Sequence, residues 1–221
     1  MSGSSRVVIF GTSDFASLAH FYLKHDTEHE VIGFSVHERY LSAPTFEGQP
    51  VVAFEELEEH YSRDDVCLFA PMSPSRANQD REAVFDEATE RGWRFISYVS
   101  SKATTFSDLQ HGPNCFVLED NTIQPYVRIG KNVVLWSGNH IGHHSSIGDH
   151  AFVSSHVVVS GHCTIGENVY LGVNSTLRDA TTIGRGAVVG MGANVVRDVA
   201  AGTVNVGNPA RPIEADPRNA T

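Results

Sequence analysis

The sequence has few cysteines, no long apolar run and little positive charge, and each shortage excludes a class of protein. Its three cysteines (Cys67, Cys115 and Cys163) are far apart in a chain of 221 residues, which argues against a disulfide framework and against zinc-finger spacing. No apolar stretch reaches the roughly 18 residues of a membrane-spanning helix, and the first residues lack a charged segment followed by a long apolar one. We therefore expect a soluble, cytoplasmic protein.

Positive charge is scarce, and the acidic excess lies in the first half of the chain. The whole chain has 16 Lys and Arg against 26 Asp and Glu, a net charge of −10, which is the opposite of what a nucleic-acid-binding protein carries. Residues 1–100 have 8 basic and 17 acidic side chains, whereas residues 101–205 have 6 and 7. Six of the 12 histidines lie between His140 and His162. This change of composition indicates two domains, residues 1–100 and 101–205, followed by a tail at 206–221.

The first hundred residues alternate between short apolar runs and helical patterns. Strands are expected at 6–10, 30–35, 66–70 and 93–98, and helices at 14–23, 54–61 and 76–91. Alternation of this kind predicts a parallel sheet with helices on both faces. The first domain is therefore expected to be a small α/β Rossmann-like domain.

The loop after the first expected strand is the place where such a domain binds a nucleotide, with phosphate on a helix N-terminus. Gly11 and Ser13 are the candidate substrate-binding residues there. The glycine pattern is incomplete, because Asp14 and Ala16 stand at the other two positions. Two interpretations remain open: the domain binds the nucleotide of a substrate, or it only docks or positions the substrate.

A six-residue repeat occupies the second half of the chain. Every sixth position from Ile123 to Val195 is Ile, Leu or Val, the residue two places earlier is mostly small, and the residue after it is often Gly. Two inward residues separated by one outward residue make a short strand, and the remaining residues make a turn. Three strands then close an 18-residue coil, and successive coils stack by parallel hydrogen bonds. The repeat predicts a parallel β-helix of about four coils.

This pattern resembles the left-handed β-helix of the hexapeptide-repeat acyltransferases. A small Rossmann-like domain before such a helix resembles, more narrowly, the nucleotide-sugar acetyltransferases, which include the bacillosamine and perosamine N-acetyltransferases and sialic-acid O-acetyltransferase-type proteins. The resemblance is strong over residues 120–212, including the closing Val206-Gly-Asn-Pro-Ala-Arg211, and loose over residues 1–100. It implies the left-handed winding and an acetyl-CoA-dependent transferase without a metal.

Four of the clustered histidines share one position of the hexad, three residues after the core residue. They are His144, His150, His156 and His162, and Asn or Gly stands at the same position in most other hexads. Residues that tolerate positive φ at one repeated position indicate a turn, so these histidines are explained by structure. One coil separates His144 from His162, so their rings are expected to stack within about 5 Å.

His143 lies one position earlier, two residues after Ile141, where no other hexad has histidine. The resemblance implies that His143, just before Ile147-Gly148-Asp149, is the general base, and an imidazole suits removal of a proton from an amine or hydroxyl. His140 and His144 are the rival candidates. The family usually has Glu or Asp directly after this histidine, whereas this chain has His144.

The remaining site residues follow from the same resemblance. The backbone N–H of Gly161, 18 residues beyond His143, is expected to bind the oxyanion of the tetrahedral intermediate. Asn139 and His140 are candidate contacts to the sugar. The pantetheine arm of acetyl-CoA is expected to pass a set of residues along the helix, namely Phe152, Gly161, Val173, Gly190 and Met191.

These residues together predict direct acetyl transfer from acetyl-CoA to the amino group, or hydroxyl, of a nucleotide-linked sugar. The resembling enzymes are trimers with sites between subunits, so a homotrimer is expected. Two alternatives remain. One is a zinc enzyme of carbonic-anhydrase type, against which the spacing of His144, His150 and His156 argues, because they fall on three successive corners of the prism. The other is a non-catalytic nucleotide-binding scaffold.

Overall fold

The computed structural model describes residues 4–220 and divides into two compact units. The first unit comprises the chain up to Ser73 together with Ala83–Ser97, and the second comprises Pro74–Glu82 together with the chain from Tyr98 onward. The boundary thus lies close to the expected one near residue 100, except that Pro74–Glu82 belongs to the second unit. No helix among the described residues is long and apolar enough to cross a membrane.

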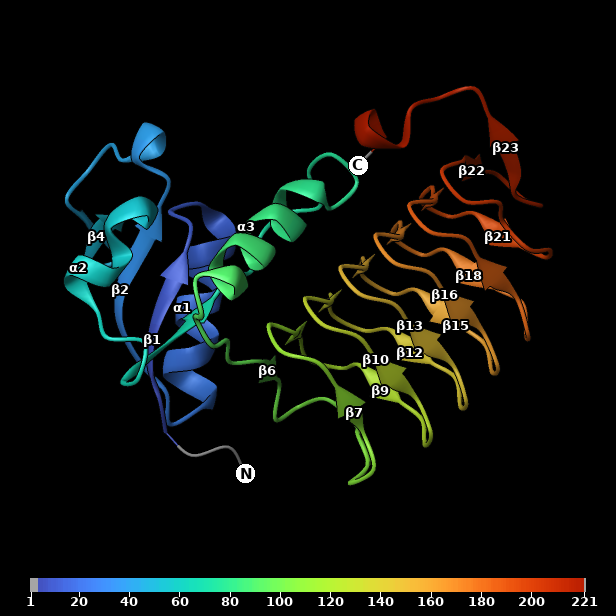
Figure 1. The fold of residues 1–221 in the computed structure, drawn as a ribbon. Helices are drawn as coiled ribbons and strands as arrows, with labels where there is room; N and C mark the ends of the chain where they lie inside the picture. The colour runs from blue at the N-terminus through green and yellow to red at the C-terminus, as the bar shows by residue number, and fades with distance from the viewer. Residues whose placement is uncertain (1–3, 221) are drawn as a thin grey trace. The chain divides into compact units, whose positions relative to one another are not determined.

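The first unit is built on a five-stranded mixed sheet with the strand order β3-β4-β2-β1-β5 (Figure 1). Its strands are β1 (Arg6–Phe10), β2 (Glu30–Val36), β3 (Thr45–Phe46), β4 (Gln49–Ala53) and β5 (Val66–Phe69). Strands β4, β2, β1 and β5 are parallel, and β3 pairs antiparallel with β4. Four of the five residues of β1 are buried, as expected of a central strand between covered faces. The antiparallel hairpin makes the sheet mixed, so the expected Rossmann-like fold is not established by its topology.

The helices among the described residues differ in length from those predicted: the first extends three residues further than expected, and the other two are shorter. The three helices are α1 (Asp14–Asp26), α2 (Leu57–His60) and α3 (Gln79–Glu90), with 3-10 turns at Glu38–Tyr40, Phe54–Glu56 and Pro217–Asn219. The predicted helix at 76–91 begins three residues late, because Arg76, Ala77 and Asn78 have φ values of 52°, 53° and 68°. These left-handed conformations are incompatible with a right-handed helix.

The predicted strand at 93–98 is wrong. Only an isolated parallel bridge between Leu68 and Phe95 remains in the first unit, and β6 (Tyr98–Val99) pairs with the second unit's strands instead. The apolar run at 93–98 is therefore divided between the cores of the two units. Sequence periodicity alone does not distinguish such a divided run from a single strand.

Three parallel sheets of two-residue strands form most of the second unit (Figure 1). The β7 face contains β7 (Gln110–His111), β10 (Arg128–Ile129), β13 (Ser146–Ile147), β16 (Thr164–Ile165) and β19 (Thr182–Ile183). The β8 face contains β6, β8 (Phe116–Val117), β11 (Val134–Leu135), β14 (Phe152–Val153), β17 (Tyr170–Leu171), β20 (Val188–Val189), β22 (Val204–Val206) and β23 (Arg211–Ile213). The β9 face contains β9 (Thr122–Ile123), β12 (His140–Ile141), β15 (Val158–Val159), β18 (Thr176–Leu177) and β21 (Asn194–Val195). Successive turns of the chain pair 18 residues apart, as Ser146 does with Thr164, so the predicted β-helix coil is confirmed.

The core of the β-helix consists of the predicted repeat residues. All 13 positions from Ile123 to Val195 are buried, with at most 5% of the side chain exposed. Small residues two places earlier, such as Ala151 and Cys163, complete the same cluster. The alternation of large and small inward residues fills the narrow interior without voids.

The turn position three residues after each core residue has the predicted left-handed conformation. His144, His150, His156 and His162 have φ values of 57°, 61°, 58° and 58°. Tyr126 and Ala180 occupy the same position with φ values of 65° and 56°, although neither residue type favours it. The repeat therefore imposes this turn whatever the side chain.

Arg81 ties the Pro74–Glu82 segment to the β-helix from within the second unit. Its side chain is fully buried and donates hydrogen bonds to the carbonyls of Asn132 and His150 and to the side chain of Asn78. Burial lowers the pKa of Arg81 to about 9, which leaves the guanidinium charged at neutral pH. The buried charge is tolerated here because backbone carbonyls accept its hydrogen bonds.

The residues expected as a tail continue the architecture. β22 pairs parallel with β20 and so extends the β8 face, and β23 folds back antiparallel against β22. The β-helix unit therefore continues through Ile213, beyond the expected limit at residue 205.

Candidate functional site

Three histidines gather at the corner of the β-helix that joins the β9 face to the β7 face. His143 and His144 lie in the turn between β12 and β13, and His162 lies in the equivalent turn one coil further, between β15 and β16. The His144 and His162 rings are stacked, with centroids 5.0 Å apart and planes at 16°, so the predicted stacking is confirmed. The His143 ring stands edge-on to both, 5.2 Å from His144 and 5.0 Å from His162.

His143 is held by polar contacts that leave its ring exposed. Its backbone N–H donates to Oε1 of Gln124 at 2.8 Å, and its Nδ1 lies 3.1 Å from Nδ1 of His144. One of these two Nδ1 atoms carries the proton and the other accepts it. With Nδ1 occupied by His144, Nε2 is the ring nitrogen of His143 that remains for another partner.

Gly161 provides the space into which the His143 ring leans. A Cβ atom on Gly161 would lie 2.8 Å from Cε1 and 3.0 Å from Nε2 of His143. Any larger residue would therefore displace the imidazole. The structure thus brings His143 and Gly161 to one corner, as their 18-residue separation predicts.

Asp179 faces the same position from the next coil. Its Oδ1 lies 2.9 Å from where a Cβ of Gly161 would be, so the carboxylate and the His143 imidazole approach one point from opposite sides. Sequence reasoning overlooked Asp179 because it searched for an acidic residue directly after His143. The signal was present in the 18-residue spacing, since His143, Gly161 and Asp179 occupy the same hexad position in three successive coils.

The backbone N–H of Gly161 takes no part in the hydrogen bonds that join successive coils of the β-helix. In the neighbouring position the N–H of His162 donates to the carbonyl of His143 at 2.9 Å. Among the described residues, no acceptor takes the N–H of Gly161. In the coil below, the corresponding N–H of His143 has a side-chain acceptor, Gln124. A free N–H beside a histidine ring is the arrangement that an oxyanion-binding group needs.

Two predicted substrate contacts precede this corner, His140 and Asn139. The first is partly exposed and the second is buried. His140 lies on β12, partly exposed, in register with Thr122 and Val158. Asn139 is 1% exposed, donates to the carbonyl of Trp136 at 2.6 Å and accepts from the N–H of Val157 at 2.7 Å. The Asn139 amide is thus used inside the coil, and His140 is the exposed one of the two.

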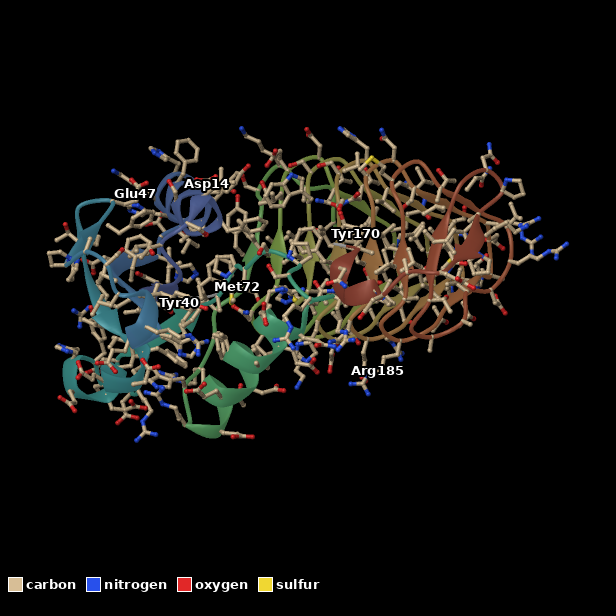
Figure 2. The ribbon with its side chains drawn as sticks, turned by 90° about the horizontal axis from the view of Figure 1, so that it is seen from above. Asp14, Tyr40, Glu47, Met72, Tyr170 and Arg185 are labelled. Atoms are coloured by element: carbon tan, nitrogen blue, oxygen red, sulfur yellow. The ribbon has the colours of Figure 1, made fainter. Side chains whose placement is uncertain are left out.

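Phe152, an expected neighbour of the pantetheine arm, has its side chain covered by other aromatic residues of this chain. It is 5% exposed and stacks between Trp136 and Tyr170, with ring centroids 6.3 and 5.8 Å away. Figure 2 labels Tyr170 on the β-helix unit, where the side chain of Arg185 extends outward. This aromatic column leaves little of the Phe152 side chain exposed.

The other predicted acetyl-CoA contacts lie at a different corner from His143. Val173 and Met191 are 40% and 81% exposed and follow β17 and β20, at the corner between the β8 and β9 faces. Gly190, in the same turn as Met191, has its open side filled, because a Cβ there would lie 2.7 Å from Cγ1 of Val206. One chain therefore brings Gly161 and His143 together but keeps Val173 and Met191 apart from them.

Comparison with known families identifies the repeat. The bacterial transferase hexapeptide family (six repeats) matches residues 126–161 and 162–197. The match thus spans the central coils of the β-helix. Together with the three parallel sheets, the hexapeptide repeats fit the predicted left-handed β-helix.

Solved structures resemble nearly the whole chain. The acetyltransferase domain of PglB from Neisseria gonorrhoeae has a TM-score of 0.84 at 20% identity, covering 94% of this chain and 99% of that one. PerB from Caulobacter crescentus, in complex with CoA and GDP-perosamine, has a TM-score of 0.81 at 22% identity, covering 95% and 97%. WeeI from Acinetobacter baumannii has a TM-score of 0.72 at 20% identity, covering 96% and 100%. At these identities the likeness establishes the fold. No curated protein sequence matches the chain.

Gly11 and Ser13 lie in the first unit, at the carboxyl end of β1. Gly11 has a φ of 117° and donates to the carbonyl of Ser35 at 2.8 Å. Ser13 precedes α1, but its side chain makes no capping hydrogen bond. A cavity of about 90 Å³ beside this loop is lined by Thr12, Val36, Tyr40, Ser42, Ala43, Thr45, Phe46 and Val51. The loop thus borders a small, partly apolar cavity at the end of the parallel strands, where α/β sheets bind ligands.

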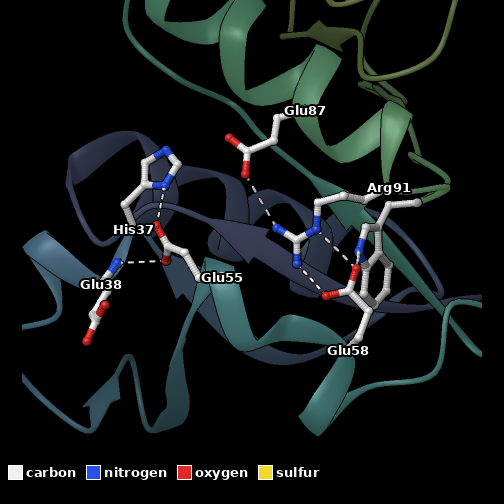
Figure 3. A network of polar contacts seen from close by, with 7 residues as sticks. His37, Glu38, Glu55, Glu58, Glu87 and Arg91 are labelled. Atoms are coloured by element: carbon white, nitrogen blue, oxygen red, sulfur yellow. Dashed lines mark hydrogen bonds and ion pairs between the residues drawn. The ribbon is translucent and has the colours of Figure 1, made fainter.

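Charged side chains of the first unit form two clusters (Figure 3). Glu58 accepts hydrogen bonds from Arg91 and from the indole of Trp93, the latter at 2.9 Å. The Arg91 guanidinium, more than any other group, lowers the pKa of Glu58 to about 2. Glu55 binds His37 at 3.0 Å and the backbone N–H of Glu38 at 2.9 Å. These contacts join β2 to the segment after β4 and serve structure rather than chemistry.

The three corner histidines also have the spacing of metal ligands. One ligand atom each of His143, His144 and His162 lies within 4.8 Å of the other two. The prediction that the clustered histidines lie at different corners applied to His144, His150 and His156. The set of His143, His144 and His162 shares one corner. The geometry of the hexapeptide unit therefore reopens a metal-binding role for the corner.

Proposed function

We propose that this protein is an acetyl-CoA-dependent acetyltransferase that acts on the amino group, or a hydroxyl, of a nucleotide-linked sugar. The fold supports the proposal, because it matches the PglB acetyltransferase domain, which has been solved in complex with acetyl coenzyme A. PerB, of the same fold, has been solved in complex with CoA and GDP-perosamine. The observation that carries the proposal for this chain is the meeting of the His143 ring and the free Gly161 N–H at one corner.

In the proposed reaction the acceptor nitrogen attacks the thioester carbon of acetyl-CoA. His143 accepts the proton that the amine loses, through Nε2, while the new C–N bond forms. The Gly161 N–H donates to the oxygen that becomes negative in the tetrahedral intermediate. The C–S bond then breaks, and the departing sulfur of CoA takes the proton from the imidazolium. The transfer is direct, with no covalent enzyme intermediate, and its steps need no metal.

Asp179 takes, in this proposal, the role of the acidic residue that does not follow His143. Its carboxylate reaches the space beside Gly161 that the imidazole also occupies. A negative charge there stabilises the imidazolium that forms when His143 accepts the proton. It also attracts the ammonium form of an amino sugar to the base.

The acetyl-CoA contacts support a site between two copies of the chain. His143 and Gly161 lie at the corner between the β9 and β7 faces, whereas the exposed Val173 and Met191 lie at the corner between the β8 and β9 faces. A groove between two β-helices brings one corner of each kind together. We therefore propose a homotrimer in which one copy supplies His143 and its neighbour supplies Val173 and Met191 along the pantetheine arm. Gly11 and Ser13 are proposed to contact the nucleotide part of the substrate.

The test is an acetyl-transfer assay with purified protein, acetyl-CoA and a panel of UDP-, GDP- and dTDP-amino sugars, measured as released CoA thiol and as acetylated product. His143→Asn is expected to lower kcat by about 100-fold or more. His111→Asn, an exposed histidine on β7 and at neither of these two corners, is the control and should retain full activity. Full activity in His143→Asn would refute the assignment of the base, and no transfer to any acceptor in the panel would count against the substrate class.

A further inference from the structure

The histidine corner has more imidazole nitrogens than acid–base catalysis uses. General base catalysis needs one ring, yet His143, His144 and His162 place ligand atoms within 4.8 Å of one another. We propose that this corner binds a divalent transition-metal ion such as Zn²⁺ or Ni²⁺, and that the bound ion inhibits the enzyme by occupying its base.

The distances suit three-histidine coordination after small side-chain movements. Zn–N bonds of about 2.0–2.1 Å in a tetrahedral site place two ligand nitrogens roughly 3.3 Å apart. The two Nδ1 atoms of His143 and His144 are already 3.1 Å apart. His162 approaches by rotating its exposed side chain, because the turn backbone is fixed and the ring has solvent on one side.

The hydrogen bonding of the corner also favours an ion. Two facing Nδ1 atoms share a single proton in the metal-free protein. When a metal ion binds both Nδ1 lone pairs, this proton moves to Nε2 of the same ring, so that both imidazoles stay neutral. The carboxylate of Asp179, beside the His143 ring, contributes a negative charge that attracts a cation to the corner. Three protein ligands leave the fourth position of the ion for water.

The inhibitory part of this inference rests on the proposed function, whereas the binding part does not. Coordination of a metal through Nδ1 leaves the hydrogen of the neutral His143 ring on Nε2, so Nε2 has no lone pair with which to accept the proton of the attacking amine. The metal-bound protein should therefore lose acetyl transfer while its fold is unchanged, and a chelator should restore the activity.

The binding test titrates the full-length, EDTA-treated protein with ZnCl₂ by isothermal calorimetry, in parallel for three proteins. Wild type and the control His111→Asn are expected to bind one Zn²⁺ per chain with equal affinity. His162→Asn should bind at least tenfold more weakly. Asparagine keeps the turn in this variant, since Asn168 and Asn174 hold the same hexad position with φ values of 57° and 58°. Equal affinity in His162→Asn and wild type would overturn the proposed site.

The activity test adds ZnCl₂ to the acetyl-transfer assay of the same three proteins. Zn²⁺ is expected to inhibit wild type and His111→Asn and to spare His162→Asn, with the inhibition of each protein measured against its own activity without metal. Inhibition of all three to the same extent would overturn the inhibitory role, and so would an EDTA-treated wild type that is inactive until zinc is added. If no protein transfers acetyl groups, the proposed function fails and the calorimetry still decides whether the metal site exists.

Discussion

His143 differs from the other clustered histidines by a single position in the hexad. His144, His150, His156 and His162 fill a turn that the repeat holds at positive φ, a place that Asn, Gly, Tyr and Ala also fill. His143 lies one residue earlier in the hexad, where its side chain lies against Gly161 of the next coil. A shift of one residue thus separates a histidine with a structural explanation from the one proposed to carry the chemistry.

At this scale the role of Asp179 is testable by substitution. Asp179→Asn removes the charge beside the His143 ring and keeps the size of the side chain, so kcat is expected to fall by about tenfold, equivalent to roughly 1.4 kcal/mol in the transition state. Asp179→Glu should recover part of the loss. Steady-state kinetics that separate kcat from KM, with thermal unfolding alongside, provide the measurement.

Asp120→Asn is the matched control for Asp179. It removes the same charge from another exposed position of the hexapeptide unit, a turn at φ 58° that asparagine also adopts. If Asp179→Asn and Asp120→Asn have the same kcat, the carboxylate beside Gly161 plays no part in the reaction.

The sequence predicts the position of a residue within a coil better than it predicts its freedom to bind a ligand. His143 and Gly161 meet because their spacing is one coil, and spacing is visible in the sequence. Asn139 is polar, yet its side chain accepts a hydrogen bond from Val157 inside the coil. Phe152 is large and apolar, yet its ring stacks on Tyr170. Burial by neighbours from other coils depends on the packed structure, so sequence periodicity does not reveal it.

At the scale of the element, several two-residue strands of the β-helix are followed by a glycine that the next coil crowds, as at Gly142. A Cβ on Gly142 would lie 2.5 Å from the carbonyl carbon of Ser160 and 2.6 Å from the nitrogen of Gly161. Backbone atoms of the next coil cannot move aside without disturbing the ladder. Glycine is therefore required by the stacking distance, independently of any ligand.

Gly142→Ala is expected to destabilise the protein by about 1–3 kcal/mol because it overpacks two coils. The matched control is Gly192→Asn, where a Cβ meets nothing within 4 Å and where the φ of 66° resembles that of Asn174. Urea unfolding of both variants provides the measurement. A stability of Gly142→Ala equal to that of Gly192→Asn would show that the coils adjust to the added methyl group.

In the first unit, the Glu58–Arg91 pair should make the free energy of unfolding depend on pH at acidic pH. Because the folded pKa of Glu58 is lowered from 4.5 to about 2, its contribution is fully present above pH 4.5 and is lost as the pH falls toward 2. Glu58 is partly exposed, and with solvent screening the contribution is about 1 kcal/mol. Glu58→Gln should be less stable than wild type by this amount at neutral pH, and the difference should shrink on acidification.

Urea titrations across this pH range test the Glu58 prediction, with Glu59→Gln as the control on the same short helix. Glu59 is exposed, so its substitution should change stability little at any pH. A constant difference between Glu58→Gln and wild type from neutral to acidic pH would contradict the role of the ion pair.

At the scale of the whole molecule, the prediction of two domains rested on a change of composition near residue 100, and the structure divides near Ser97. The β-helix was predictable in detail because thirteen core positions repeat without a slip. The mixed sheet of the first unit was not, since β3 and β4 are short and their hairpin carries no repeated pattern. Local propensity defines isolated strands poorly when their pairing partners come from elsewhere in the chain.

The proposed groove between copies predicts the size of the assembly. Light scattering after size-exclusion chromatography should give three times the mass of the chain. Met191→Asp, at the exposed corner between the β8 and β9 faces, should weaken the binding of CoA without altering the fold. A monomeric protein that still transfers acetyl groups would contradict a site shared between copies.

The buried guanidinium of Arg81 limits how the chain can be divided for experiments. Arg81 belongs to Pro74–Glu82, a segment of the β-helix unit. The next segment, Ala83–Ser97, belongs to the first unit again. A fragment that starts at Tyr98 would leave the carbonyls of Asn132 and His150 without this donor, at a cost of about 1–3 kcal/mol for each polar group left buried without a partner. We expect a fragment that begins at Pro74 to unfold at a higher temperature than one that begins at Tyr98. The two halves are thus interleaved in sequence, so an exchange of first units between relatives would also have to carry a matching arginine segment.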